Sequence, residues 1–246
     1  NMSLSALYSV EEPLTDIQLK QIYSYYQSIV KQDTYFIDCA GTPQQIADSL
    51  YHYWEKYCAR SGRVLVYVID HVKLIKKMPG QSDIDLLDTM MTLLVDLKKK
   101  IATAGGKSLG YVLSQLNREI TKDNRVLNKE MHRPDPSCLY ASSAIEFACD
   151  LIVCPHIPAK IGIQSYTTEN LPTWYMHNGI KLPMAYLEVI KNRSGISDVT
   201  IPLYNKLNRF NFDEMESEVF DDLRKQWHED KTNIPEIRKQ SKLKLE

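Results

Sequence analysis

Apolar residues recur along this chain at helical spacing in some segments and as short continuous runs in others. Helical spacing follows Thr15 and Thr42, each of which stands three residues before a Gln in the arrangement of a capping box. The pattern predicts helices over about 16–30, 43–58, 83–103 and 142–148. The continuous runs predict strands at 34–37, 64–69, 109–113 and 151–153. This alternation indicates an α/β fold whose sheet is covered by helices.

The C-terminal third of the chain has a different pattern. Strand-like runs at 184–191, 198–203 and 208–212 are joined by short turns, which predicts antiparallel pairing at one edge of the sheet. A charged helix is expected over about 213–228, followed by a tail at 231–246. A polar stretch at 117–136 predicts a long loop with helical parts. We therefore divide the chain into an α/β domain at 1–212 and a charged helix and tail at 213–246.

The strand predicted at 64–69 leads directly into Asp70. A carboxylate at the carboxyl end of a buried parallel strand lies where open α/β sheets place their ligands. This is the arrangement of the Walker B element of P-loop ATPases, in which the acid faces nucleotide-bound Mg²⁺. The alternative for an isolated motif of this kind is a structural Asp that caps a helix or forms an ion pair.

Composition narrows the class of protein. The formal net charge of −1 over 246 residues leaves no global basic signal, so contact with nucleic acid would have to be local. The five cysteines are odd in number and scattered, which is typical of reduced thiols in a cytoplasm-like compartment. No segment predicts a membrane span or a signal peptide, so we expect a cytoplasmic location and no membrane partner.

Four segments, in this order, resemble the ATPase domain of DnaB-type replicative helicases of bacteria and phages, a hexameric RecA-like family. Residues 113–118 reproduce the family's Leu-Ser-Gln-Leu-Asn-Arg without change. The first segment is residues 68–74. The third consists of residues 133–134 with 142–146 and 150, and the fourth of residues 191–195 with 208–210. The resemblance extends over about residues 14–212. It implies a RecA-like fold: a twisted, mainly parallel sheet flanked by helices, with antiparallel strands at the C-terminal edge.

The resemblance also implies roles for single residues. Asp70 would hold Mg²⁺, directly or through water, and Gln115 would sense the γ-phosphate of ATP. Arg193 would be an arginine finger with Lys191 as its partner, both reaching the nucleotide of the neighbouring subunit. Arg209 would also contact the nucleotide. Glu146 and Asp150 would organise the subunit interface and the end of the sheet.

The implied partners are single-stranded DNA, further copies of the chain in a hexameric ring, and a primase or helicase loader, in a bacterial or phage-infected cell. Two loops carry candidate DNA contacts, although a solvated surface is an alternative for each residue. The first loop contains Lys73, Lys76 and Lys77, and the second contains Arg118, Lys122, Arg125, Lys129 and Arg133.

The phosphate-binding P-loop of the family is absent from these 246 residues. The one Gly-Lys-Ser segment, at 106–108, follows a predicted helix and precedes a predicted strand, which reverses the order that a P-loop needs. Two explanations remain: the sequence is part of a longer helicase, or the protein is a degenerate ATPase. The leading hypothesis is the ATP-hydrolysing motor domain of a hexameric helicase. The alternatives are a non-hydrolysing RecA-like module that binds DNA or assembles with helicase subunits, and another RecA-like ATPase such as a recombinase or clock-type ring protein.

Overall fold

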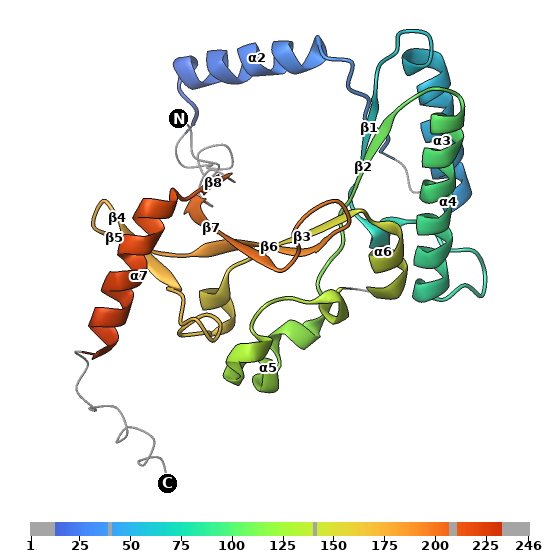
Figure 1. Ribbon diagram of the computed structural model, residues 1–246. Helices are drawn as coiled ribbons and strands as arrows, with labels where there is room; N and C mark the ends of the chain where they lie inside the picture. Colours follow the sequence, from blue (N-terminus) through green and yellow to red (C-terminus); the bar gives the residue numbers. More distant parts are fainter. Residues whose placement is uncertain (1–12, 39–40, 140–141, 207–210, 233–246) are drawn as a thin grey trace.

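A computed structural model describes residues 13–38, 41–139, 142–206 and 211–232 of the chain (Figure 1). The α-helices are α2 (Asp16–Val30), α3 (Pro43–Tyr53), α4 (Asp83–Thr103), α5 (Asp123–Leu127), α6 (Ser142–Ala148) and α7 (Ser217–Thr232). The strands are β1 (Leu65–Ile69), β2 (Ser108–Val112), β3 (Leu151–His156), β4 (Trp174–His177), β5 (Ile180–Pro183), β6 (Ala185–Asn192), β7 (Val199–Lys206) and β8 (Asn211–Glu214). A π-helical turn, η1 (Trp54–Cys58), continues α3. The 3₁₀ turns are η2 (Val72–Leu74), η3 (Arg118–Thr121), η4 (Lys129–Met131), η5 (Pro136–Cys138) and η6 (Pro158–Ile161).

The predicted starts of α2, α3 and α4 are confirmed, whereas the charged helix expected from about residue 213 begins at Ser217 as α7. Thr15, Thr42 and Ser82 each accept a hydrogen bond from the backbone N–H three residues on, and the side chain of that residue accepts one from the backbone N–H of the cap. These capping boxes begin α2, α3 and α4. The helices α3 and α4 bury one face each, whereas α2 lies apart from the body of the molecule and has no buried residue.

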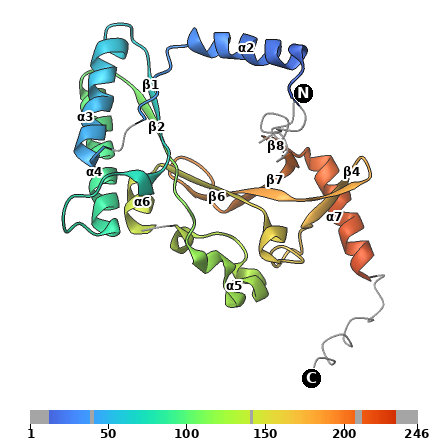
Figure 2. The same ribbon diagram turned by 180° about the vertical axis from the view of Figure 1, so that it is seen from behind.

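Strands β1 and β2 pair in parallel, from Leu65 opposite Ser108 to Ile69 opposite Val112. Figures 1 and 2 show α3 and α4 together on one side of this pair. Leu65 faces them and belongs to the first core, which also includes Leu87, Met90 and Ile101 of α4. The opposite face of the pair carries apolar side chains that remain exposed: Val64, Val66, Val68, Leu109, Tyr111 and Leu113.

The remaining strands are antiparallel. One sheet has the order β3-β6-β7-β8, and β4 and β5 form a separate hairpin. The prediction of a mainly parallel sheet is therefore wrong for the described residues, where β1–β2 is the single parallel pairing. An apolar run predicts a strand but does not determine its partner, and β3 pairs with β6 rather than with β2. The structure is a mixed α/β fold with a small parallel sheet and a larger antiparallel one.

A second core lies in the antiparallel part of the molecule. It is built from Tyr166, Tyr186, Met184 and Met215, with Phe220 of α7 packed against it. The strand β8 extends across the boundary predicted at residue 212, and Asp213 and Glu214 pair with β7 instead of beginning a helix. The antiparallel edge and the C-terminal helix are therefore packed together.

The strand predicted at 34–37 is wrong. The described part of this segment, residues 33–38, has no regular secondary structure. Tyr35 instead stacks on Tyr57 with ring centroids 4.9 Å apart and lies 5.1 Å from the ring of Tyr53. A β-branched and aromatic run needs an adjacent strand edge to become a strand, and none of the described strands pairs with it here.

Candidate functional site

The predicted catalytic residues Asp70 and Gln115 lie at the carboxyl ends of the two parallel strands. The backbone continues the pairing beyond β1 and β2, because Leu113 N–H donates to Ile69 O at 3.0 Å and Val72 N–H to Leu113 O at 3.3 Å. Parallel pairing brings equivalent ends of the strands to the same edge of the sheet. Asp70 and Gln115 are therefore neighbours in space, although 45 positions separate them in the sequence.

His71 lies between these two residues. Its Nε2 is 3.4 Å from the amide Nε2 of Gln115, and its Nδ1 is 3.8 Å from Oδ1 of Asp70. The neutral imidazole can accept the Gln115 amide hydrogen at Nε2 while it presents Nδ1–H toward the carboxylate. The sequence analysis assigned no role to His71. The signal that could have identified it is its position directly after Asp70.

Asp70 fits the Mg²⁺ ligand that the resemblance implies. Its side chain is 73% exposed, at the end of a strand. Mg²⁺ keeps several water ligands and typically takes one or two carboxylates together with substrate phosphates. Among the described residues, no three His, Cys, Asp or Glu side chains gather closely enough to hold a metal ion by themselves.

Lys191 and Arg193 lie at the far end of β6, where they contact the C-terminal turn of α6. Lys191 Nζ donates to the carbonyl oxygen of Glu146, and Arg193 Nη2 donates to that of Phe147 at 2.8 Å. The last carbonyls of a helix lack partners within the helix and carry its negative dipole end, so cations are favoured there. Both predicted nucleotide-contacting cations are thus held by α6 of their own chain.

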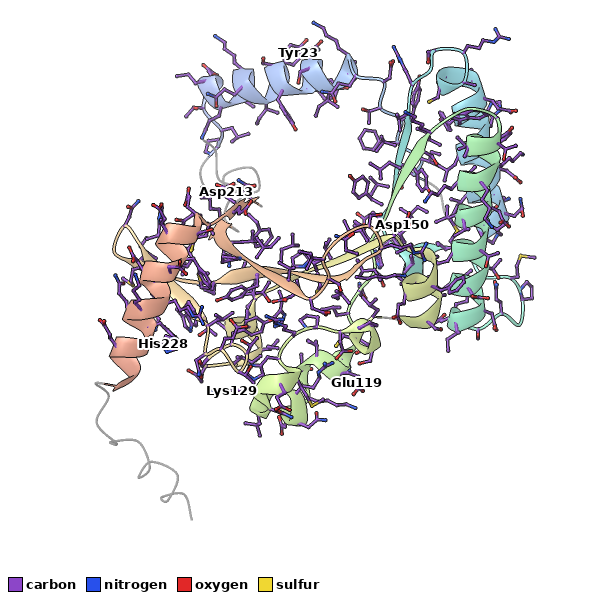
Figure 3. The ribbon with its side chains drawn as sticks, in the orientation of Figure 1. Tyr23, Glu119, Lys129, Asp150, Asp213 and His228 are labelled. Atoms are coloured by element: carbon purple, nitrogen blue, oxygen red, sulfur yellow. The ribbon has the colours of Figure 1, made fainter. Side chains whose placement is uncertain are left out.

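Asp150 connects Arg193 to α4. Its Oδ1 is 3.0 Å from Arg193 Nη1, its Oδ2 is 2.6 Å from Lys98 Nζ, and its carbonyl oxygen accepts the Arg193 N–H at 2.8 Å. The hydrogen bond from Lys98, with the charges of Lys98 and Arg193, holds the pKa of Asp150 below its usual value. Figure 3 labels Asp150 where α4, α6 and the antiparallel sheet meet.

The first candidate DNA loop follows Asp70. Lys76 and Lys77 are exposed, and Lys77 forms an ion pair with Asp83 at the start of α4. Residues 72–74 form the 3₁₀ turn η2 that leads into this loop. Lys76 and Lys77 are thus on the surface, close in sequence to the carboxyl end of β1, while the side chain of Lys73 lies outside the described part of the chain.

The second candidate loop starts and ends at one place. An isolated antiparallel bridge joins Leu116 to Leu139, and Asn117 holds the other side through its N–H to Cys138 O at 2.7 Å and its Nδ2 to Ser137 O at 2.6 Å. Between these ends lie α5 and three 3₁₀ turns, as the polar sequence predicts. Figure 3 labels Glu119 and Lys129 on this projecting segment.

The basic residues of this loop are not equivalent. Arg118 is exposed, and Lys122 is exposed but lies 2.5 Å from Oε1 of Glu119. Arg125 is 5% exposed: its Nε donates to Met131 O at 3.2 Å, and it forms an ion pair with Asp135. Arg125 holds the loop together and is not accessible to a nucleic acid in this structure.

Arg209, the remaining predicted nucleotide contact, lies outside the described residues. Gly106 follows the end of α4 and lies against the ring of Trp54, which a Cβ atom would approach to 2.5 Å. The Gly-Lys-Ser segment therefore connects a helix to a strand, and the Gly106 N–H already donates to Ile101 O at 2.9 Å.

A comparison with solved structures shows a distant fold relation. No family model and no curated protein matches the chain. A solved structure described as "The Structure Of A DnaB-Like Replicative Helicase And Its Interactions With Primase" is similar, with a TM-score of 0.56 and 14% sequence identity. The match covers 87% of this chain and 46% of the helicase chain, so the sequence spans less than half of that protein. Among the described residues, no helix combines the length and apolar character that crossing a membrane requires.

Proposed function

We propose that this chain is part of the motor domain of a DnaB-like replicative helicase, which couples ATP hydrolysis to movement along single-stranded DNA. The observation that carries the proposal is the neighbouring position of Asp70 and Gln115 at the carboxyl ends of two parallel strands, with His71 between them. A carboxylate for Mg²⁺ and an amide for the terminal phosphate at one sheet edge form the basic arrangement of a nucleotide-hydrolysing site. The distant fold relation to a helicase supports the same conclusion.

The residues have separate tasks in this proposal. Mg²⁺ bound with ATP neutralises charge on the transferring phosphate. Asp70 would hold the ion, directly or through water, with its exposed carboxylate. In the absence of nucleotide, Gln115 donates its amide hydrogen to His71. When ATP is bound, Gln115 donates to a phosphate oxygen instead, and this exchange alters the contacts of the adjoining segment, residues 117–139. Lys191 and Arg193 provide positive charge for the nucleotide that an adjacent subunit of a hexameric ring binds. A primase or a helicase loader would bind this ring.

The test is ATP turnover by this chain, and by the complete open reading frame if one extends upstream, with and without single-stranded DNA. Arg193→Ala is expected to lower DNA-stimulated turnover by about 10³-fold or more and to leave ATP binding nearly unchanged, because an arginine finger acts in the transition state. Binding is measured with a fluorescent ATP analogue. Loss of binding together with turnover would contradict the assignment of Arg193 as a finger.

A second function is favoured by the contacts of the two cations. Lys191 and Arg193 are both bonded to α6 of their own chain, and the 246 residues contain no P-loop motif. A RecA-like module that binds DNA or assembles with helicase subunits, without hydrolysing ATP, has these features. This second function would be favoured if this chain and the protein from the complete open reading frame both bind DNA and neither hydrolyses ATP.

A further inference from the structure

The clearest group of charges outside the Asp70 edge is formed by Lys98, Asp150 and Arg193. These residues come from three places that are distant in the sequence: Lys98 from α4, Asp150 from the position just before β3, and Arg193 from the turn after β6. Asp150 uses one carboxylate oxygen for each cation, at 2.6 Å and 3.0 Å. The two cations therefore share one carboxylate, and the group has a net charge of +1.

The guanidinium of Arg193 is held at two points. Nη1 bonds to the Asp150 carboxylate and Nη2 to the Phe147 carbonyl, which fixes both the direction and the plane of the group. Arginine has five N–H donors in a rigid fork, so three remain for another ligand. The side chain is 53% exposed, so these donors can be reached from outside the subunit.

Lys98 changes the electrostatics of this arrangement. An unshared carboxylate beside Arg193 would cancel its charge and weaken its attraction for a phosphate. Because Lys98 binds the second oxygen of Asp150, the group stays cationic while Asp150 still orients the guanidinium. Orientation before the reaction lowers the barrier, since the group does not have to reorganise as charge develops.

We propose that Asp150 is the positioning residue for Arg193, fixing its guanidinium toward the subunit exterior, and that Lys98 keeps the group cationic. This inference rests on the proposed function for its catalytic consequence, but the orientation itself can be measured without turnover. Asp150 touches neither substrate nor reacting atoms and acts through Arg193.

The first experiment is side-chain ¹⁵N NMR of the Arg193 Nε–Hε group, assigned by its loss in Arg193→Lys. The wild-type chain should show an ordered, slowly exchanging signal, and Asp150→Asn should make it mobile or broaden it by exchange. Asp150→Glu should restore part of the order. Asp96→Asn is the matched control, because Asp96 lies on α4 and pairs with Lys99 outside the group. An unchanged Arg193 signal in Asp150→Asn would overturn the proposal.

The second experiment is turnover kinetics in whichever protein hydrolyses ATP. Asp150→Asn should lower kcat by roughly tenfold with little change in KM, since misplacing a group costs less than removing it. Lys98→Met should mainly raise KM for ATP, by a few-fold, because the orientation remains and one charge is lost. If Asp150→Asn lowers kcat by the same factor in the wild type and in Arg193→Ala, Asp150 does not act through Arg193, and the positioning role is overturned. No turnover by the wild type would overturn the proposed function alone, because the NMR signal still reports the orientation.

Discussion

Several polar side chains are buried in the antiparallel half of the molecule, and their partners explain how. Glu188 accepts hydrogen bonds from Tyr166 Oη at 2.7 Å and Thr200 Oγ1 at 2.8 Å. His132 accepts from the Thr167 N–H at Nδ1, so its Nε2 carries hydrogen and donates to Val126 O at 3.0 Å. Burial lowers the pKa of His132, consistent with this neutral form.

His156 lacks such a partner, because its Nε2 is buried and forms no hydrogen bond. Burial is the main cause that lowers the pKa of His156 to about 4, and the neighbouring His132 would disfavour a second positive charge there. The unfolded chain, with a His pKa of about 6.5, binds a proton before the folded chain does. Stability should therefore be complete above pH 6.5 and fall toward pH 4, by on the order of 3 kcal/mol for this residue.

Urea unfolding between pH 7 and pH 4.5 measures this effect. His156→Phe keeps a ring beside Tyr166 and removes the proton site, so it should flatten the dependence of the unfolding free energy on pH. His52→Gln, at an exposed position on α3, is the control and should leave the dependence unchanged. A wild-type slope that persists in His156→Phe would show that another group causes it.

Single residues also show the limits of reading the sequence. The position of Asp70 could be predicted, because a strand end fixes it. Arg125 could not be distinguished from Arg118, since both are basic residues in a polar segment. Only the fold shows that Arg125 is surrounded by carbonyls and Asp135 while Arg118 is exposed.

At the scale of elements, the end of α4 is fitted against the end of α3. Gly106→Ala would place a Cβ atom 2.5 Å from the Trp54 ring, and backbone as well as ring must move to accept it. We expect a loss of about 1–3 kcal/mol in unfolding free energy, measured by urea titration. Lys107→Ala, at the exposed neighbouring position, should change neither stability nor nucleotide binding. Loss of nucleotide binding in Lys107→Ala would show instead that this segment holds phosphate.

The two candidate loops should bind DNA through exposed cations. Lys76→Ala combined with Arg118→Ala is expected to weaken binding of a labelled oligo-dT and to reduce the salt slope by about 0.7 for each lost phosphate contact. Fluorescence anisotropy at several salt concentrations gives both values. Lys225→Ala removes an exposed cation of α7 and is the matched control. An equal loss in this control would indicate a diffuse charge effect rather than a contact by the loops.

Local signals predicted the elements far better than their partners. Capping boxes and apolar spacing located α2, α3 and α4 closely, because these features act within one helix. The hairpin β4–β5 was not predicted, since each strand has four residues and little alternation. Strand direction was predicted in the C-terminal third, where short turns favour the antiparallel pairing that β6, β7 and β8 show. It was not predicted for β3, because an apolar run does not determine the partner of a strand.

For the molecule as a whole, one face of β1–β2 carries a row of apolar side chains that remain exposed. Val66 lies opposite Leu109, and Val68 opposite Tyr111, all exposed. Contiguous apolar surface of this kind binds hydrophobic dyes. The folded chain should enhance the fluorescence of ANS, and Val66→Lys with Tyr111→Lys should remove most of that enhancement.

Ile196→Lys provides the control for this prediction. Ile196 is 79% exposed in the turn between β6 and β7, where it stands alone. Its replacement should leave ANS fluorescence unchanged. Equal losses in the two variants would mean that the dye reports scattered apolar residues rather than the sheet face.

The bridge between Leu116 and Leu139 has an evolutionary consequence. Because the ends of residues 117–138 are held together at this bridge, a change in the length of the segment does not move the strand end before it. Lengthening such a closed segment has a small entropic penalty, about 0.6 kcal/mol for each doubling. The segment is also tied to the antiparallel half of the molecule, through His132 to the Thr167 N–H and through Arg133 to Glu188. Its length can therefore vary at low cost, whereas these two contacts have to be kept or replaced together.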